Sequence, residues 1–393
     1  MIFSYMIKRL RRHPSEAIVS AAIVLVIVVF LIGLLSARAD LLADMDRAYE
    51  TIEIRCRVTS ANNSREYSLP ITEDYVKMLT EEEGVLYPYV EDVFLLETYP
   101  TAAVLPPDTP VEHYYGAPGM SVELHMTNDP ESYTLKEGAE FEYLEGYSSA
   151  SFAGDEPICM ISHTLKELVG EDGTVIVRVA QGSIAMKMKV IGTYGDEKAT
   201  VFGAWQPLLE LISTLDWKPN VGSMAFTIAD NRKLDVAKTI LRDYYVPASK
   251  LNNDSVQLGL IVDDSLFVDT ITVYERSLSL LKVVQTMVYV LSIGISFLVA
   301  YLNIRARRLE LAVMRSLGTR SIALYAEVLS EHTLFFLIGG LLATVGAMLF
   351  GIMPGGEQMK TVGTFMLCYL FGVAIAVAQA TSGKIMQTLK GKE

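Results

Sequence analysis

The sequence of 393 residues has few of the residues that catalytic and metal-binding sites need. It holds five histidines and three cysteines, and His113, His125 and His163 lie far apart in the chain. It contains no His-Glu-x-x-His pattern and no Walker A motif. Its Ser-Gly-Lys at residues 382–384 does not complete a Walker A motif, because Ala378 stands five positions before Gly383, where that motif has a glycine. We therefore expect no catalytic residue, metal ion or cofactor in this chain.

Positive charge is also scarce in the middle of the chain. Residues 39–282 carry 40 acidic and 19 basic side chains, a net charge of −21 in a chain whose total is −13. A surface with this charge repels phosphate, which argues against nucleic acid as a partner. The excess could steer cationic peptides towards this region, although solubility explains it more simply.

What the sequence does have is four long apolar runs, and apolar residues make up 51% of the chain. A helix needs about 20 mostly apolar residues to cross the hydrocarbon core of a membrane, and backbone groups in lipid must be paired within the helix. The runs are Ala17–Leu35, Val283–Leu302, Thr333–Phe350 and Val362–Ala380. The first is longer than the roughly 7–15 residues of a signal-peptide core. We predict four transmembrane helices.

Basic residues near these runs predict the orientation, because lysine and arginine gather on the cytoplasmic side of a membrane. They precede the first run, separate the second from the third and follow the fourth: Lys8, Arg9, Arg11, Arg12; Arg305, Arg307, Arg308, Arg315, Arg320; Lys384, Lys390, Lys392. All three groups fall on one side if there are four spans. We expect both termini in the cytoplasm and residues 39–282 outside it.

The external region reads as a mixture of strands and helices. Apolar and charged residues alternate from Ile52 to Val58, which is typical of a strand with one wet face. Further strands are expected at 90–98, 175–179, 186–190 and 224–228, and helices at 72–82, with Thr72 as N-cap, 162–168 and 234–245. We predict an α+β domain in two lobes, joined to the membrane by a helical stalk at each end.

The three cysteines allow more than one interpretation. Cys56 and Cys159 both lie in the external region and could form a disulfide in an oxidising compartment, or remain as two buried free thiols. Cys368 lies inside the fourth run and is expected to act as a small apolar side chain.

The loop between the second and third spans predicts a short helix with two unlike faces. Gly318 is expected to end this helix. One face could lie on the membrane surface, and it holds Leu309, Ala312, Val313, Ser316 and Leu317. The opposite face holds Arg308, Leu311, Met314 and Arg315. Leu311 and Met314 would be polar if they met only water, so this face indicates either a protein partner or a juxtamembrane helix with incidental apolar residues.

These segments resemble the MacB/FtsX-type permeases of ABC transporters, the mechanotransmission or type VII family. Glu310, Arg315 and Gly318 match the Glu-Ile-x-x-x-Arg-x-x-Gly pattern that follows the second span in that family, and Glu331 with Gly339-Gly340 matches its third span. The layout of one span, a large external domain and three further spans also matches. Further similar stretches lie at 135–138, 157–158, 165–168 and 190–192.

The resemblance implies a membrane protein with three parts. These are the cytoplasmic N-terminus with helix 1 (1–38), a MacB-like α+β domain (39–282), and helices 2–4 with a cytoplasmic coupling loop at 303–325 (283–393). The coupling residues would be Arg308, Glu310, Leu311, Met314, Arg315 and Gly318. Glu331, Gly339 and Gly340 would serve helix packing or function within the membrane, although Glu331 could also be a residue that snorkels to the head groups.

The resemblance also implies partners and a function. The chain differs from MacB in having no fused nucleotide-binding domain, so a separate ATPase subunit would bind ATP and Mg²⁺. A second permease, identical or similar, would complete the dimer. The chain would reside in a bacterial cytoplasmic membrane and drive export or extraction of an amphiphilic substrate, such as a peptide, a lipoprotein or an antibiotic. The alternatives are a transmitter that regulates a cell-wall hydrolase, as FtsX-like members do, and a ligand-sensing receptor.

Overall fold

The computed structural model describes residues 14–61, 63–114, 116–133, 139–179, 184–195, 198–214, 221–247, 257–349 and 355–382. The chain divides into a helical unit, Met1–Arg47 with Asp269–Glu393, and an outer unit, Ala48–Val268. The basic residues predicted at 8–12 and 384–392 and the similar stretch at 135–138 lie outside the described residues, as does Phe350. The predicted domain boundaries at residues 38 and 282 fall inside continuous helices and stay predictions.

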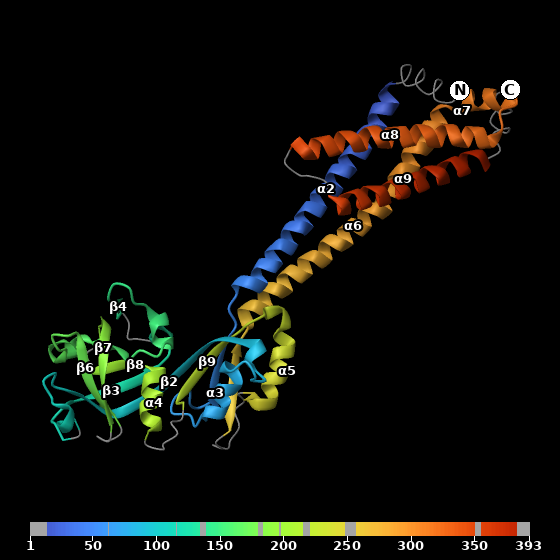
Figure 1. Ribbon diagram of the computed structural model, residues 1–393. Helices are drawn as coiled ribbons and strands as arrows, with labels where there is room; N and C mark the ends of the chain where they lie inside the picture. Colours follow the sequence, from blue (N-terminus) through green and yellow to red (C-terminus); the bar gives the residue numbers. More distant parts are fainter. Residues whose placement is uncertain are drawn as a thin grey trace. The chain divides into compact units, whose positions relative to one another are not determined.

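Within the described residues, five helices contribute to the helical unit. They are α2 (Pro14–Thr51), α6 (Ser265–Ala306), α7 (Arg308–Ser316), α8 (Ser321–Leu349) and α9 (Gly356–Ser382). Four of them are long and apolar enough to cross a membrane: α2, α6, α8 and α9. The four predicted spans are therefore confirmed as helices, and α2 and α6 continue through both predicted stalks (Figure 1).

The four long helices share one apolar cluster. It joins side chains of α2, α6, α8 and α9, among them Val28, Ala300, Phe336 and Tyr369. Many other apolar side chains of these helices are exposed in the isolated chain, such as Leu341 and Leu367. A soluble bundle would bury such residues, whereas lipid or a second membrane protein covers them in a membrane helix.

The described residues of the outer unit form a sheet of eleven strands. They are β1 (Arg55–Ser60), β2 (Val90–Leu105), β3 (Met120–Thr127), β4 (Phe141–Tyr143), β5 (Ile158–Ser162), β6 (Thr174–Val179), β7 (Ile184–Tyr194), β8 (Thr200–Ala204), β9 (Ser223–Ile228), β10 (Val246–Pro247) and β11 (Leu258–Asp263). The helices are α3 (Glu73–Thr80), α4 (Trp205–Ser213) and α5 (Leu234–Tyr244), with 3-10 turns at Tyr87–Tyr89, Val111–His113, Pro130–Ser132, Ser149–Ala153, His163–Leu168 and Asn231–Lys233.

Six of these strands close into a barrel. The strand order is β10-β11-β1-β9-β2-β3-β8-β5-β7-β4, and β6 pairs with both β2 and β7. The ring β2-β3-β8-β5-β7-β6 thus returns to β2, which removes exposed edges. Phe152, Met160 and Phe202 belong to a buried cluster of this lobe.

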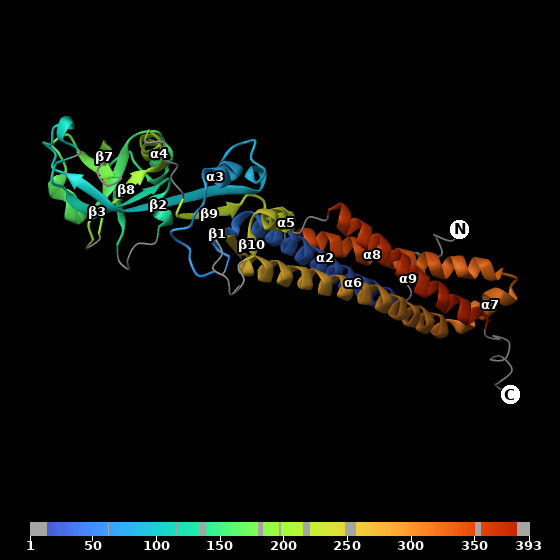
Figure 2. The same cartoon turned by 90° about the horizontal axis from the view of Figure 1, so that it is seen from below.

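The other lobe is an open sheet with helices, and the long strand β2 belongs to both lobes (Figure 2). The first half of β2 pairs with β9 and its second half with β3 and β6.

In β1, Cys56 and Val58 are buried while Arg55 and Arg57 are exposed, as the alternation predicted. Thr72 occupies the N-cap position of α3, but its side chain makes no capping hydrogen bond. The two-lobed α+β prediction is confirmed.

Candidate functional site

One residue, Arg307, separates the end of α6 from the short helix α7, and a glycine follows the end of α7. Gly318 has φ +89°, a left-handed conformation that glycine adopts without a steric penalty. The amide of Leu317 donates to the carbonyl of Val313, and that of Thr319 donates to the carbonyl of Met314, each at 3.1 Å. These bonds satisfy carbonyls at the helix end, so the predicted stop at Gly318 has a clear structural cause.

The exposed apolar side chains described on and beside α7 belong to the face that the sequence pattern placed on the membrane surface. Leu309, Val313 and Leu317 are 70%, 57% and 80% exposed. Leu311 instead packs against the apolar cluster of the membrane helices, and Met314 is half-buried. The coupling roles predicted for Leu311 and Met314 stay predictions. Leu309, Val313 and Leu317 are therefore available for contact with another molecule.

The charged residues predicted for this loop occupy different surroundings. Arg308 and Glu310 are exposed. Arg315 belongs to α7, but the structure does not describe its side chain. Glu310 lies near the corner between α6 and α7, where its Oε2 is 3.8 Å from Nε of Arg307. The coupling roles of Arg308, Glu310 and Arg315 stay predictions.

A buried ion pair connects the α6–α7 corner to α8. Nη1 of Arg307 donates to Oε2 of Glu331 at 2.8 Å, and the two side chains are only 7% and 12% exposed. The pair gives Glu331 a buried partner, and its role in packing or function within the membrane stays a prediction. Sequence reasoning counted Arg307 only as a basic residue, because nothing local to the sequence connects positions 24 residues apart.

The two adjacent glycines of α8 differ in what surrounds them. A Cβ on Gly339 would lie 2.6 Å from the carbonyl oxygen of Ala21 and 3.0 Å from Cβ of Val24, so α2 and α8 pack closely there. A Cβ on Gly340 would meet nothing closer than 3.8 Å. Gly372 on α9 is a further close contact, against Ile293 and Ser296 of α6, which sequence reasoning did not single out. Small residues allow such close approach of helices in a membrane.

The two outer cysteines are free thiols in separate places. Cys56 lies on β1 and Cys159 on β5, and both are buried. Burial raises the pKa of Cys56 to about 12 and raises that of Cys159 as well, which keeps both as unreactive thiols. Of the two alternatives, a disulfide and two buried free thiols, the structure contains the free thiols.

No group of three or more potential metal ligands occurs within the described part of the chain. His125 is a core residue whose Nδ1 lies 3.0 Å from Oγ1 of Thr98 and whose ring contacts Tyr133 and Phe202.

The comparisons with known proteins give structural similarities. No protein-family model matches the sequence, and no curated protein matches it. The chain is similar to the periplasmic region of MacB from Actinobacillus actinomycetemcomitans, with 10% identity, a TM-score of 0.33 and coverage of 57% of this chain and 94% of that one. It is also similar to the extracellular domain of YknZ, a noncanonic ABC-type transporter from Gram-positive bacteria, with 11% identity, a TM-score of 0.31 and coverage of 53% and 99%.

A third similarity is to a domain described as that of a permease protein from Porphyromonas gingivalis, with 15% identity, a TM-score of 0.30 and coverage of 53% and 88%. Each of the three similarities covers a little over half of this chain. The four long apolar helices fit the layout of the MacB/FtsX-type permeases that the sequence motifs resemble.

Proposed function

We propose that this chain is the permease subunit of an ABC transporter and that α7 is the element that docks onto a separate ATPase subunit. The observation that carries the proposal is the exposed apolar row Leu309, Val313 and Leu317, on and directly after a short helix between two membrane spans. Three large apolar side chains one helical turn apart form a contact stripe, and such stripes mark interaction surfaces.

The attachment of α7 supports a mechanical role. Arg307 lies at the corner before α7 and is paired with Glu331 of α8, while Leu311 packs against the cluster of the spans. A push on α7 would therefore reach both α6 and α8. A free loop helix without these contacts would move independently of the membrane helices.

The distribution of basic residues supports the orientation. Arg305, Arg307 and Arg308 lie on the same side of the membrane as both termini if all four helices span it. The positive-inside rule then assigns α7 and the termini to the cytoplasm, where a soluble ATPase binds ATP and Mg²⁺. The protein would reside in a bacterial cytoplasmic membrane.

The lengths of α2 and α6 support transmission of motion to the outer unit. They contain 38 and 42 residues, about twice the number needed to span the hydrocarbon core. Each continues without a break from its apolar segment into residues of the outer unit. A helix is stiff along its axis, so closure of an ATPase dimer below a permease dimer would shift the outer units and drive export or extraction of an amphiphilic substrate.

The test is whether an ATPase depends on the exposed row of α7. The full chain is purified from its native membrane, and co-eluting nucleotide-binding proteins and ATPase activity are measured. The variant Leu309→Glu/Val313→Glu places two carboxylates in the row, and we expect it to lose both the co-eluting ATPase and its activity. Met359→Glu is the matched control, since Met359 is also a largely exposed apolar residue at a helix end but lies near the third-to-fourth loop.

The same variants separate two interpretations of α7. If α7 only lies on the membrane surface, the double variant and the control will retain an ATPase equally. If no nucleotide-binding protein accompanies the unmodified chain, the transporter proposal fails and a receptor function becomes the better explanation.

A further inference from the structure

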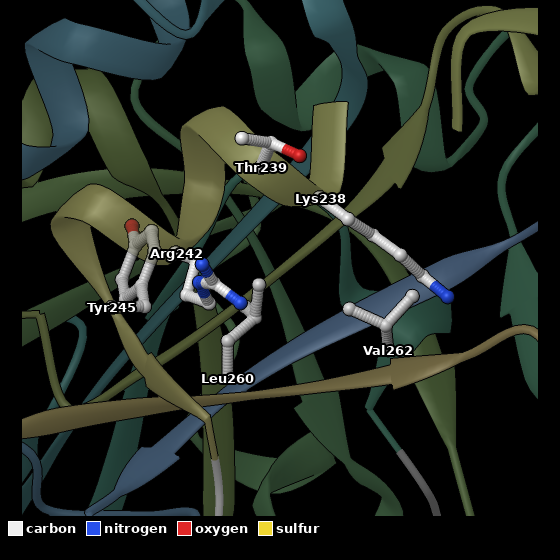
Figure 3. Close-up of a pocket in the computed structure, with 6 residues that line it drawn as sticks. All are labelled: Lys238, Thr239, Arg242, Tyr245, Leu260 and Val262. Atoms are coloured by element: carbon white, nitrogen blue, oxygen red, sulfur yellow. The ribbon is translucent and has the colours of Figure 1, made fainter. Parts of the chain in front are cut away.

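A small pocket in the outer unit combines cationic and aliphatic side chains. It has a volume of about 280 Å³ and lies between α5 and β11. Figure 3 shows that the cationic side chains come from the helix and the aliphatic ones from the strand. The residues that line it are Lys238, Thr239, Arg242, Tyr245, Leu260 and Val262.

The pocket exists because α5 covers the sheet incompletely. The helix buries Leu234, Ala237 and Leu241. Leu260 and Val262 pair with Val58 and Cys56 of β1, so they lie on the apolar side of the sheet, yet both remain half-buried. Two aliphatic side chains thus form a floor that the helix leaves uncovered.

The charge of the pocket is opposite to that of the surrounding domain. Nζ of Lys238 forms an ion pair with Oδ2 of Asp264, so these two charges cancel. Arg242 is exposed, and its guanidinium has no ion pair with any other described residue. Among the described residues, the pocket therefore presents one positive charge without an ion-pair partner, within a region of net charge −21.

We propose that this pocket binds an apolar monocarboxylate, with the carboxylate on Arg242 and the aliphatic part on Leu260 and Val262. An arginine guanidinium matches a carboxylate with two parallel hydrogen bonds. The volume is close to the lower end of the roughly 300–1,000 Å³ typical of ligand pockets, which suits a short chain or a chain end. Two sources supply this chemistry: a free fatty acid and the C-terminus of an apolar peptide.

The pocket lies at a junction in the chain. Asp264, which holds Lys238, immediately precedes α6. A ligand bound here would contact the strand from which the helix to the second span begins. The inference stands apart from the proposed transport function, because it concerns binding to the outer unit alone.

The experiment measures binding of [1-¹³C]octanoate to the full chain in lipid nanodiscs by ¹³C NMR, with empty nanodiscs subtracted. We expect octanoate to bind, octanamide to bind more weakly, and Arg242→Gln to weaken octanoate by about tenfold or more, the usual effect of losing a hydrogen-bonded charge. Lys166→Gln is the matched control, since it removes one exposed positive charge from the same unit outside the pocket.

A second variant and a second ligand sharpen the outcome. Leu260→Asn keeps the charge and removes the apolar floor, so it should weaken octanoate more than it weakens acetate. N-acetyl-Leu-Leu is compared with octanoate, and whichever binds more tightly with dependence on Arg242 identifies the source of the carboxylate. The proposal is overturned if the unmodified chain does not bind octanoate, if octanamide binds equally well, or if Arg242→Gln and Lys166→Gln behave alike.

Discussion

The buried pair between Arg307 and Glu331 gives the sharpest prediction about the helical unit. In Glu331→Gln the side chain keeps its shape, but the guanidinium of Arg307 remains buried with only the half-exposed carboxylate of Glu310 near it, 3.8 Å from its Nε. Removing one partner of a buried ion pair costs about 3–5 kcal/mol, because the remaining charge stays out of water. The exposures of 7% and 12% and the 2.8 Å separation place this pair in that class.

Glu310→Gln is the matched control within the same cluster of charges. Glu310 is 42% exposed and lies 3.8 Å from Nε of Arg307, so this interaction is screened by solvent. Exposed pairs contribute about 0–1 kcal/mol. We therefore expect Glu310→Gln to change the free energy of unfolding by less than about 1 kcal/mol.

The assay is titration of the full chain in mixed micelles with sodium dodecyl sulfate, followed by helical circular dichroism. A double variant, Arg307→Met/Glu331→Leu, removes both charges and should recover most of the stability that Glu331→Gln loses, because apolar replacements of a buried pair are often neutral or stabilising. The reasoning is wrong if Glu331→Gln unfolds like Glu310→Gln, or if the double variant is less stable than Glu331→Gln.

Three further predictions concern packing, pH dependence and thiol reactivity. Gly339→Ala should destabilise the chain by about 1–3 kcal/mol in the same titration because its Cβ would press on α2, whereas Gly340→Ala should be tolerated; equal effects would contradict the close contact. Burial raises the pKa of Glu97 to about 7, so the folded state holds a proton that the unfolded state releases above its ordinary pKa of 4.5. Stability should therefore fall between about pH 4.5 and 7, and Glu97→Gln should flatten that slope in thermal melts. Cys56 and Cys159 should resist a maleimide reagent until the outer unit unfolds, and rapid labelling of the native chain would show that they are accessible.

Some features of the protein follow from local sequence alone. The four apolar runs determine four helices because a chain in lipid must pair its own backbone groups, whatever surrounds it. Gly318 ends α7 because its left-handed conformation suits glycine, and the alternation around Cys56 sets the two faces of β1 because side chains of a strand alternate. Each of these depends on residues within a few positions of one another.

Other features were decided only by tertiary structure. Helical periodicity separated two faces of α7, but it did not show that Leu311 packs against the apolar cluster, because that cluster is formed by helices far away in sequence. The pairing of Arg307 with Glu331 and the closure of the barrel by β6 join segments that no local pattern links. The pocket beside Arg242 exists because α5 leaves part of β11 uncovered, and only the packing of that helix on the sheet determines which side chains remain within reach of a ligand.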